Sequence, residues 1–185
     1  RDDVIQSLWE LEHDDPTQVL KTRLKSAGLR PKTAADLASE MALSVSDIES
    51  RLNDLVTAKD VISYVQASKA VFVHAECWAQ LLDGIAGAME QFHNTHPLRP
   101  GARRDELRAL VPGRPSDDFF AYGVEHLIKK GALKSEEALI RLSDYEIELT
   151  AEQEQIRDTI VQLLQAGGTT PKDLKELPEA VGSDA

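Results

Sequence analysis

Cysteine is nearly absent from this sequence, because Cys77 is the only one. A single thiol cannot form a disulfide within the chain, which fits a reducing compartment. Long hydrophobic runs are missing too. None approaches the roughly 18 apolar residues of a membrane span, and the N-terminus lacks the basic and then apolar order of a signal peptide. These absences argue against a disulfide-stabilised or membrane-spanning chain and predict a cytoplasmic protein.

Positive charge is also scarce. The chain has 21 lysines and arginines against 32 aspartates and glutamates, which gives a formal net charge of −11. Phosphates would be repelled over most of such a surface. Broad nucleic-acid binding is therefore excluded, and any contact with nucleic acid must be local.

Capping residues mark three helices in the first part of the chain. Asp15 precedes a proline, and Thr33 and Ser46 each have an acid three residues on, arrangements that are typical of helix starts. Apolar residues follow these caps at helical spacing: Val19, Leu20, Leu24, Leu37, Met41, Ile48, Leu52 and Leu55. Residues 61–65 and 70–73 then become β-branched and aromatic, which predicts a hairpin. Three helices closed by a hairpin make a winged helix.

The same order of elements then recurs. A helix over about residues 75–94 is followed by a second helix with Leu107 and Leu110 facing inward, a third helix capped by Ser116, and a hairpin over 132–142. The two copies are offset by about 72 residues, and a repeat of that period is typical of stacked modules.

A third copy begins but stops early. Thr150 and Gln153 form a capping pair before another apolar-spaced helix, and Thr170 opens one more short helix before the chain ends. We therefore predict a mostly α fold with small β-hairpins (α+β), built from tandem winged-helix modules. The expected limits are 1–74 with a lead-in helix, 75–148, and an incomplete module at 149–185.

One segment of this acidic chain is rich in arginine. Residues 92–108 read Phe-His-Asn-Thr-His-Pro-Leu-Arg-Pro-Gly-Ala-Arg-Arg-Asp-Glu-Leu-Arg. Pro97 must end the preceding helix, and Leu98 is expected to be buried at a module junction with Phe92 and His93. The arginines here are candidate contacts for RNA or the ribosome: Arg99, Arg103, Arg104, Arg108 and Arg114. The alternative is a solvated helix face that contacts nothing.

The third helix is the element with which winged helices usually read nucleic acid. Its leading end is acidic in both copies, with Asp47 and Glu49 in the first and Asp117 and Asp118 in the second. These acids suit the positive end of the helix dipole. They would repel phosphate, so we do not expect either helix to enter a groove.

Catalytic and metal-binding patterns are weak in this sequence. His93 with His96, and His74 with Cys77, have ligand-like spacing, but neither pair has a second pair to complete four ligands. The large aromatic residues are expected to be packing anchors: Trp9, Trp78, Phe92 and Phe120. We therefore expect no catalytic residue, no metal and no cofactor in this chain.

The order of the arginine-rich segment resembles a known family. An aromatic-His pair, three residues, Pro-Leu-Arg-x-Gly and then Arg-x-Glu-Leu-Arg, over 92–108, is similar to the C-terminal winged-helix region of the selenocysteine-specific elongation factor, SelB. Residues 15–24, 74–78 and 148–153 also resemble that family. The resemblance covers about residues 11 to 177.

This resemblance implies a role in translation. Members of the family are GTPases that use GTP and Mg²⁺ and carry selenocysteinyl-tRNA to the ribosome at a recoded stop codon. Their last winged helix holds an mRNA hairpin. Because this sequence has no Walker lysine motif, the resemblance implies a non-catalytic, monomeric arm segment between the GTPase body and the hairpin-binding tip. Two alternatives stay open: a DNA-binding regulator and a protein-interaction module.

Overall fold

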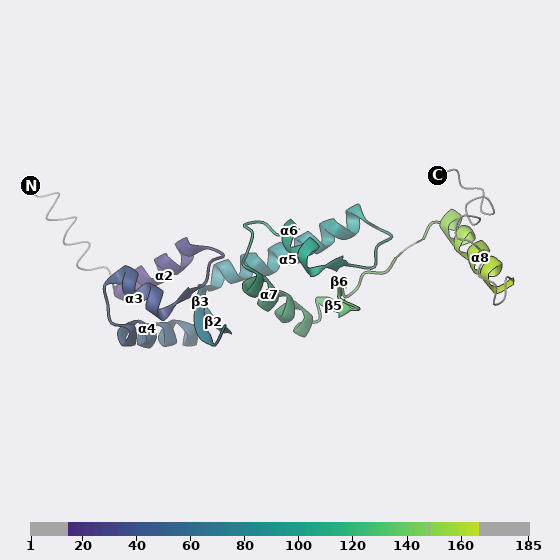
Figure 1. The fold of residues 1–185 in the computed structure, drawn as a ribbon. Coiled ribbons are helices and arrows are strands. Elements are labelled where there is room, and N and C mark those ends of the chain that lie inside the picture. The colour runs from purple at the N-terminus through teal and green to yellow at the C-terminus, as the bar shows by residue number, and fades with distance from the viewer. Residues whose placement is uncertain (1–14, 148, 167–185) are drawn as a thin grey trace, which may run out of the picture. The chain divides into compact units, whose positions relative to one another are not determined.

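The computed structural model describes residues 15–147 and 149–166 of the chain. These residues form two compact units: residues 15–95 with 101–145, and residues 96–100 with 146–166. The first unit contains two winged helices, so the predicted fold class is confirmed (Figure 1). Within the described ranges, no helix is both long and apolar enough to cross a membrane. The predicted lead-in helix and the helix after Thr170 lie outside the described residues.

The first winged helix has three helices and a three-stranded antiparallel sheet of order β1-β3-β2. Its elements are α2 (Pro16–Ala27), β1 (Lys32–Thr33), α3 (Ala34–Met41), α4 (Val45–Thr57), β2 (Val61–Gln66) and β3 (Lys69–His74). Its core contains Leu20, Leu24, Leu37, Ile48 and Leu52, each fully buried. The core therefore consists mainly of the leucines and isoleucine that the helical spacing picked out.

Two of the three predicted caps in this module are correct. Asp15 accepts a hydrogen bond from the Thr17 amide, and Thr33 with Asp36 forms a capping box. The prediction for Ser46 is wrong, because α4 is capped by Ser44, whose hydroxyl accepts from the Asp47 amide at 3.1 Å. Ser44 has the extended backbone that a cap requires, and Ser46 lies inside the helix.

The second winged helix repeats this architecture with a sheet of order β4-β6-β5. Its elements are α5 (Ala75–Thr95), β4 (Ala102–Arg103), α6 (Arg104–Leu110), α7 (Asp117–Lys129), β5 (Leu133–Glu136) and β6 (Leu139–Leu142). Ser116 caps α7 as predicted, by accepting from the Phe119 amide. Leu107 is fully buried, whereas Leu110 is 40% exposed at the end of α6, so the prediction that it faces inward is wrong.

The internal repeat is visible in the hairpin turns. Ala67 and Ser68 connect β2 to β3, and Glu137 and Ala138 connect β5 to β6, with all four residues at positive φ. A two-residue turn of this kind matches the right-handed twist of the flanking strands. The same turn geometry without glycine in both copies supports the repeat that the spacing predicted.

Strand β3 is shared between the two winged helices. Alternate side chains of a strand point to opposite faces, and residues Val71 to His74 are all buried. Phe72 belongs to the core of the first module, whereas Val71 and Val73 belong to the core of the second, together with Tyr64 of β2. The outer face of the first hairpin is therefore part of the second core.

The second unit contains one further helix, α8 (Ala151–Ala166). Thr150 and Gln153 exchange hydrogen bonds at its start: the Thr150 amide donates to Oε1 of Gln153, and the Gln153 amide donates to the Thr150 hydroxyl. This is the predicted capping pair. Ile156 and Ile160 are half-buried.

Candidate nucleic-acid interface

Helix α6 carries the centre of the arginine-rich segment. Its first turn is fixed by the Arg103 amide, which donates to Oε2 of Glu106 at 2.9 Å. The fully buried side chain of Leu107 packs α6 against the core of the second module. With Leu107 inside, Arg104 and Arg108 are four residues apart and lie on one side of the helix.

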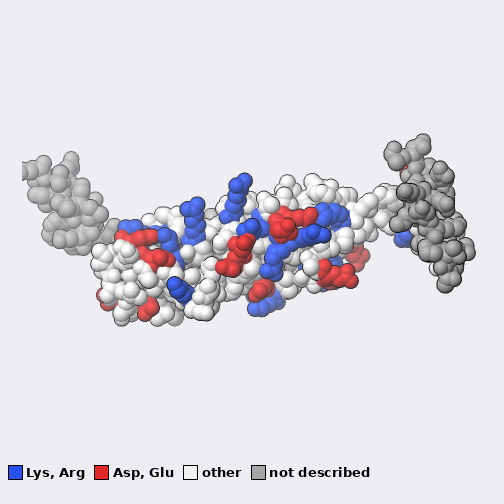
Figure 2. Space-filling view, viewed as in Figure 1, with Lys and Arg blue, Asp and Glu red and all other residues white. Residues whose placement is uncertain are grey.

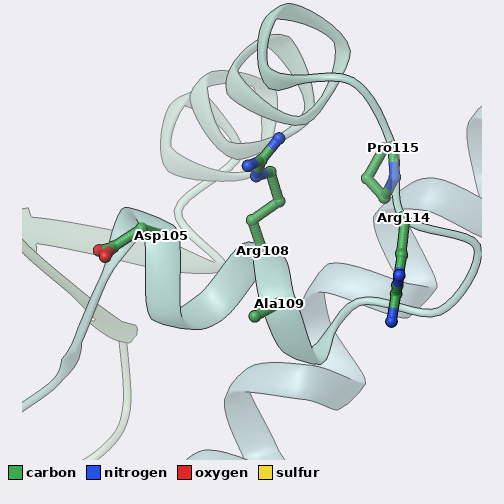
Figure 3. A pocket seen from close by; sticks show the side chains of 5 residues that line it. All are labelled: Asp105, Arg108, Ala109, Arg114 and Pro115. Carbon is green, nitrogen blue, oxygen red and sulfur yellow. The ribbon is translucent and has the colours of Figure 1, made fainter.

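A surface hollow of about 350 Å³ lies beside α6 (Figure 3). It is lined by Asp105, Arg108, Ala109, Arg114 and Pro115. The two guanidinium groups point in different directions, and the Asp105 carboxylate points away from both. The hollow thus presents two cations from separate stretches of chain and one acid at its edge.

The two arginines of the hollow differ in their partners. Arg108 forms an ion pair with Asp117, the first residue of α7. Arg114 is exposed and has a left-handed backbone, with φ of 47°, directly before a proline. A non-glycine residue in that conformation is strained and is maintained only by the structure around it. Val111 and Pro115, on either side of Arg114 in the chain, are both buried.

The five arginines predicted to contact RNA or the ribosome do not all lie in one place in the structure. Arg108 and Arg114 line one hollow, and Arg104 lies one helical turn before Arg108. Arg103 is the residue that precedes α6, and its side chain is exposed. Arg99 belongs to the other compact unit. Figure 2 shows blue and red side chains intermixed over this part of the molecule, so no extended surface of one charge is seen in this view.

The third helices of both modules carry exposed acids at their leading ends, as predicted. In α7 these acids contact other parts of the protein. Asp117 pairs with Arg108, and Asp118 accepts a hydrogen bond from Nε2 of Gln66 at 2.8 Å. The end of α7 that would enter a groove thus has side-chain contacts with α6 and with the first hairpin.

The junction residues fall into two groups. Phe92 and His93 are buried at the end of α5, and Nε2 of His93 accepts a hydrogen bond from the Leu142 amide at 3.4 Å. Burial, and then the nearby Arg141, lower the pKa of His93. Pro97 follows the end of α5, as expected. Leu98 is 51% exposed, so the prediction that it is buried is wrong; it lies in a turn closed by the Arg99 amide and the His96 carbonyl.

Two residues of the His and Cys pairs with metal-ligand spacing, His74 and Cys77, have other contacts in the structure. His74 accepts from the Glu76 amide at the start of α5, and the Cys77 thiol lies 3.6 Å from the Lys25 carbonyl. Within residues 15–147 and 149–166, no three His, Cys, Asp or Glu side chains gather as metal ligands. Trp78, Phe92 and Phe120 are buried, which confirms them as packing anchors; Trp9 lies outside the described residues.

Sequence reasoning missed the contacts that join the two modules. The Tyr64 ring stacks on Tyr122 of α7, with centroids 4.4 Å apart. A Cβ placed on Gly113 would lie 2.8 Å from Cδ1 of Leu29, so the loop after α6 fits closely against the first module. We call these contacts and the Gln66–Asp118 hydrogen bond the seam. No local sequence signal predicts such long-range pairs.

The fold and its shared core define a tandem winged-helix protein. Residues 87–142 match the family described as elongation factor SelB, winged helix. The chain is also 26% identical over 176 residues to a selenocysteine-specific elongation factor of Desulfomicrobium baculatum, an alignment that covers 91% of this chain. The resemblance found in the sequence, to the winged-helix region of the selenocysteine-specific elongation factor, is thereby confirmed.

The chain spans about a quarter of the length of this curated relative, because the alignment covers 26% of that protein. The matched winged helix runs from within α5 to the end of β6. It therefore contains α6, α7 and the arginine-lined hollow.

Proposed function

We propose that this chain is an arm segment of a selenocysteine-specific elongation factor. In this role it links the GTPase and tRNA-binding body to the tip that binds the mRNA hairpin during selenocysteine incorporation. The observation that carries the proposal is the seam, which joins two winged helices into one compact unit. Such a unit can hold two distant functional parts at a fixed separation.

The partners and cofactors follow from the whole factor. Selenocysteinyl-tRNA, the ribosome and the mRNA selenocysteine-insertion hairpin would be bound by the full-length protein, which would use GTP and Mg²⁺ in a different part of its chain. We expect this segment to be non-catalytic, cytoplasmic and monomeric. The match to a SelB winged helix and the similarity to a translation factor support the first two of these expectations.

The acidic leading end of α7 favours the arm over a DNA-binding regulator. A regulator would insert its third helix into the major groove with the leading residues toward the bases. Here Asp117 and Asp118 occupy that end and contact other parts of the protein. A protein-interaction module remains the second candidate from another class, because the same fold serves many functions.

A titration with the mRNA hairpin tests the proposal. The fragment should bind a labelled hairpin only weakly and without sequence preference, with a dissociation constant of roughly 10⁻⁴ to 10⁻⁶ M at physiological salt. The full-length relative from Desulfomicrobium baculatum, titrated with its own hairpin, is the positive control. Submicromolar, sequence-specific binding by the fragment would contradict the arm role.

A further inference from the structure

The seam places a sixth arginine, Arg30, next to a contact that Arg114 also flanks. Leu29 of the first module fits against Gly113 of the second, and each of these residues is followed directly by an arginine, Arg30 and Arg114. Because consecutive Cα atoms are about 3.8 Å apart, both arginines begin close to the same contact. Arg30 lies far from the arginine-rich segment in sequence, so only the fold associates the two.

Several cations of the first unit have acidic partners. These pairs include Lys21–Asp60, Lys25–Glu76, Lys32–Glu40, Arg51–Asp15 and Arg141–Glu136. Among the residues that the structure describes, the guanidinium groups of Arg30, Arg104 and Arg114 have no carboxylate within ion-pair distance. The same is true of Arg103 and of several lysines. In a chain where acids outnumber bases 32 to 21, exposed arginines without acidic partners are informative.

The helix dipole does not explain these arginines. Lys59, Lys129 and Lys130 lie at the C-terminal ends of α4 and α7, where the dipole stabilises a cation. Arg104 is instead the first residue of α6, the end at which the dipole opposes positive charge. Arg114 lies in a loop with a strained backbone. Both positions cost stability in the isolated protein, which favours a role in binding an anion.

We propose that the hollow and its rim bind backbone phosphates of RNA across the seam. Arg108 and Arg114 line the site, Arg104 extends it along α6, and Arg30 completes it from the first module. The planar guanidinium group donates two parallel hydrogen bonds to a phosphate, which suits arginine for this contact. Because the site reads phosphates rather than base edges, its binding is independent of sequence.

Asp117 limits this site in the free protein. Its carboxylate holds Arg108 in an ion pair, so an incoming phosphate competes with it. Both side chains of the pair are substantially exposed, at 39% and 80%, and an exposed pair of this kind is weak. A phosphate can therefore share Arg108 with Asp117 or displace Asp117 from it. Removing the Asp117 charge should strengthen binding of the phosphate.

The first experiment measures RNA affinity directly, with a fluorescein-labelled, mixed-sequence single-stranded RNA of about 20 nucleotides as the probe. The fragment should bind with an affinity that falls with salt, with a slope of about −3 if roughly four cations contact phosphates. Arg30→Gln and Arg104→Gln should each reduce the magnitude of that slope by about 1. Lys130→Gln is the matched control, because it removes the same charge at the far end of α7.

Two further variants separate binding from folding. Arg114→Gly removes a charge but relieves the left-handed backbone, so it should raise the denaturation midpoint while weakening RNA binding. Asp117→Asn should tighten RNA binding several-fold. Asp118→Asn removes the same charge at the adjacent position but leaves Arg108 paired, so it should tighten binding less.

The results that would overturn this site differ from those that would overturn the arm role. The proposed site would be wrong if Arg30→Gln and Lys130→Gln changed the RNA affinity and the salt slope equally. It would also be wrong if Asp117→Asn and Asp118→Asn changed the RNA affinity equally. No RNA binding at low salt would also remove it. The arm role would survive each of these outcomes, because it fails only if the fragment binds the hairpin tightly and specifically.

Discussion

The Tyr64 and Tyr122 rings lie nearly parallel, with planes inclined by 13° and centroids 4.4 Å apart. Tyr64 belongs to the hairpin of the first winged helix and Tyr122 to the third helix of the second. Burial, followed by the nearby Asp118 charge, raises the pKa of Tyr64. Its hydroxyl therefore stays neutral at physiological pH, and the stacked pair joins the two modules without a buried charge.

Tyr64→Ala should destabilise both modules together. The change removes a large buried side chain and its stacking contact with Tyr122, with an expected loss of roughly 3 kcal/mol in the free energy of unfolding. Val65→Ala is the control, because the neighbouring side chain is 74% exposed and should cost less than about 0.5 kcal/mol. Chemical denaturation followed by circular dichroism measures both. Loss of the first module alone, with the second unchanged, would contradict the shared core.

Two glycines on the long helices should respond oppositely to alanine. A Cβ on Gly123 of α7 would lie 2.8 Å from Cδ1 of Ile85 and 3.0 Å from Cδ2 of Leu81, both fully buried residues of α5. Overpacking of this kind costs roughly 1–3 kcal/mol, which outweighs the gain of about 1 kcal/mol in helix propensity. Gly87→Ala meets nothing within 4 Å and should stabilise the protein. Thermal denaturation of both variants decides the signs.

His93 should make stability depend on pH. Its pKa is lowered in the folded protein, first by burial and then by Arg141. The neutral His93 side chain therefore contributes fully to the stability of the folded protein above the unfolded pKa of 6.5. That contribution to stability is lost as the pH falls toward the lower pKa of the folded state. Protonation would also remove the acceptor for the Leu142 amide.

The measurement for His93 is the free energy of unfolding between pH 7.5 and 5.5, where most carboxylates stay ionised. Wild-type protein should lose stability over that range. His93→Gln should lose less, because glutamine does not titrate. Equal losses in both proteins would show that His93 is not responsible.

Phe92 and Leu98 should differ strongly in their effect on stability. Phe92 is 3% exposed, so Phe92→Ala should cost roughly 3–5 kcal/mol. Leu98 is half-exposed, and Leu98→Ala should change stability by less than about 0.5 kcal/mol. Urea denaturation of the two variants gives the comparison. A large loss for Leu98→Ala would mean that its side chain is buried in solution.

Local features of the sequence predicted most of the fold. The caps at Asp15, Thr33 and Ser116 depend on neighbours within three residues, so they were visible before folding. Ser44 and Ser46 both have an acid three residues on. Local chemistry cannot choose between them, because both offer a hydroxyl before an acid at the same spacing.

The candidate site was only half predictable. Arg104, Arg108 and Arg114 are close in sequence, and their concentration in an acidic chain drew attention to them. The position of Arg30 depends on the Leu29–Gly113 contact between the modules. The Asp117 pairing depends on the fold bringing the start of α7 within reach of Arg108. Neither has a periodic or local signal. The exposure of Leu110 was not predictable either, because its spacing from Leu107 suits a buried position but it is the last residue of α6.

Strand β3, with both faces buried, determines where this chain can be divided. A cut after His74 would follow the predicted module limit, but it would expose Val71, Val73 and Tyr64 to water. That hairpin would present an apolar face and an unprotected edge, which favour self-association. The smallest well-behaved fragment should therefore contain both winged helices, and expression trials of residues 15–74 alone should give aggregates.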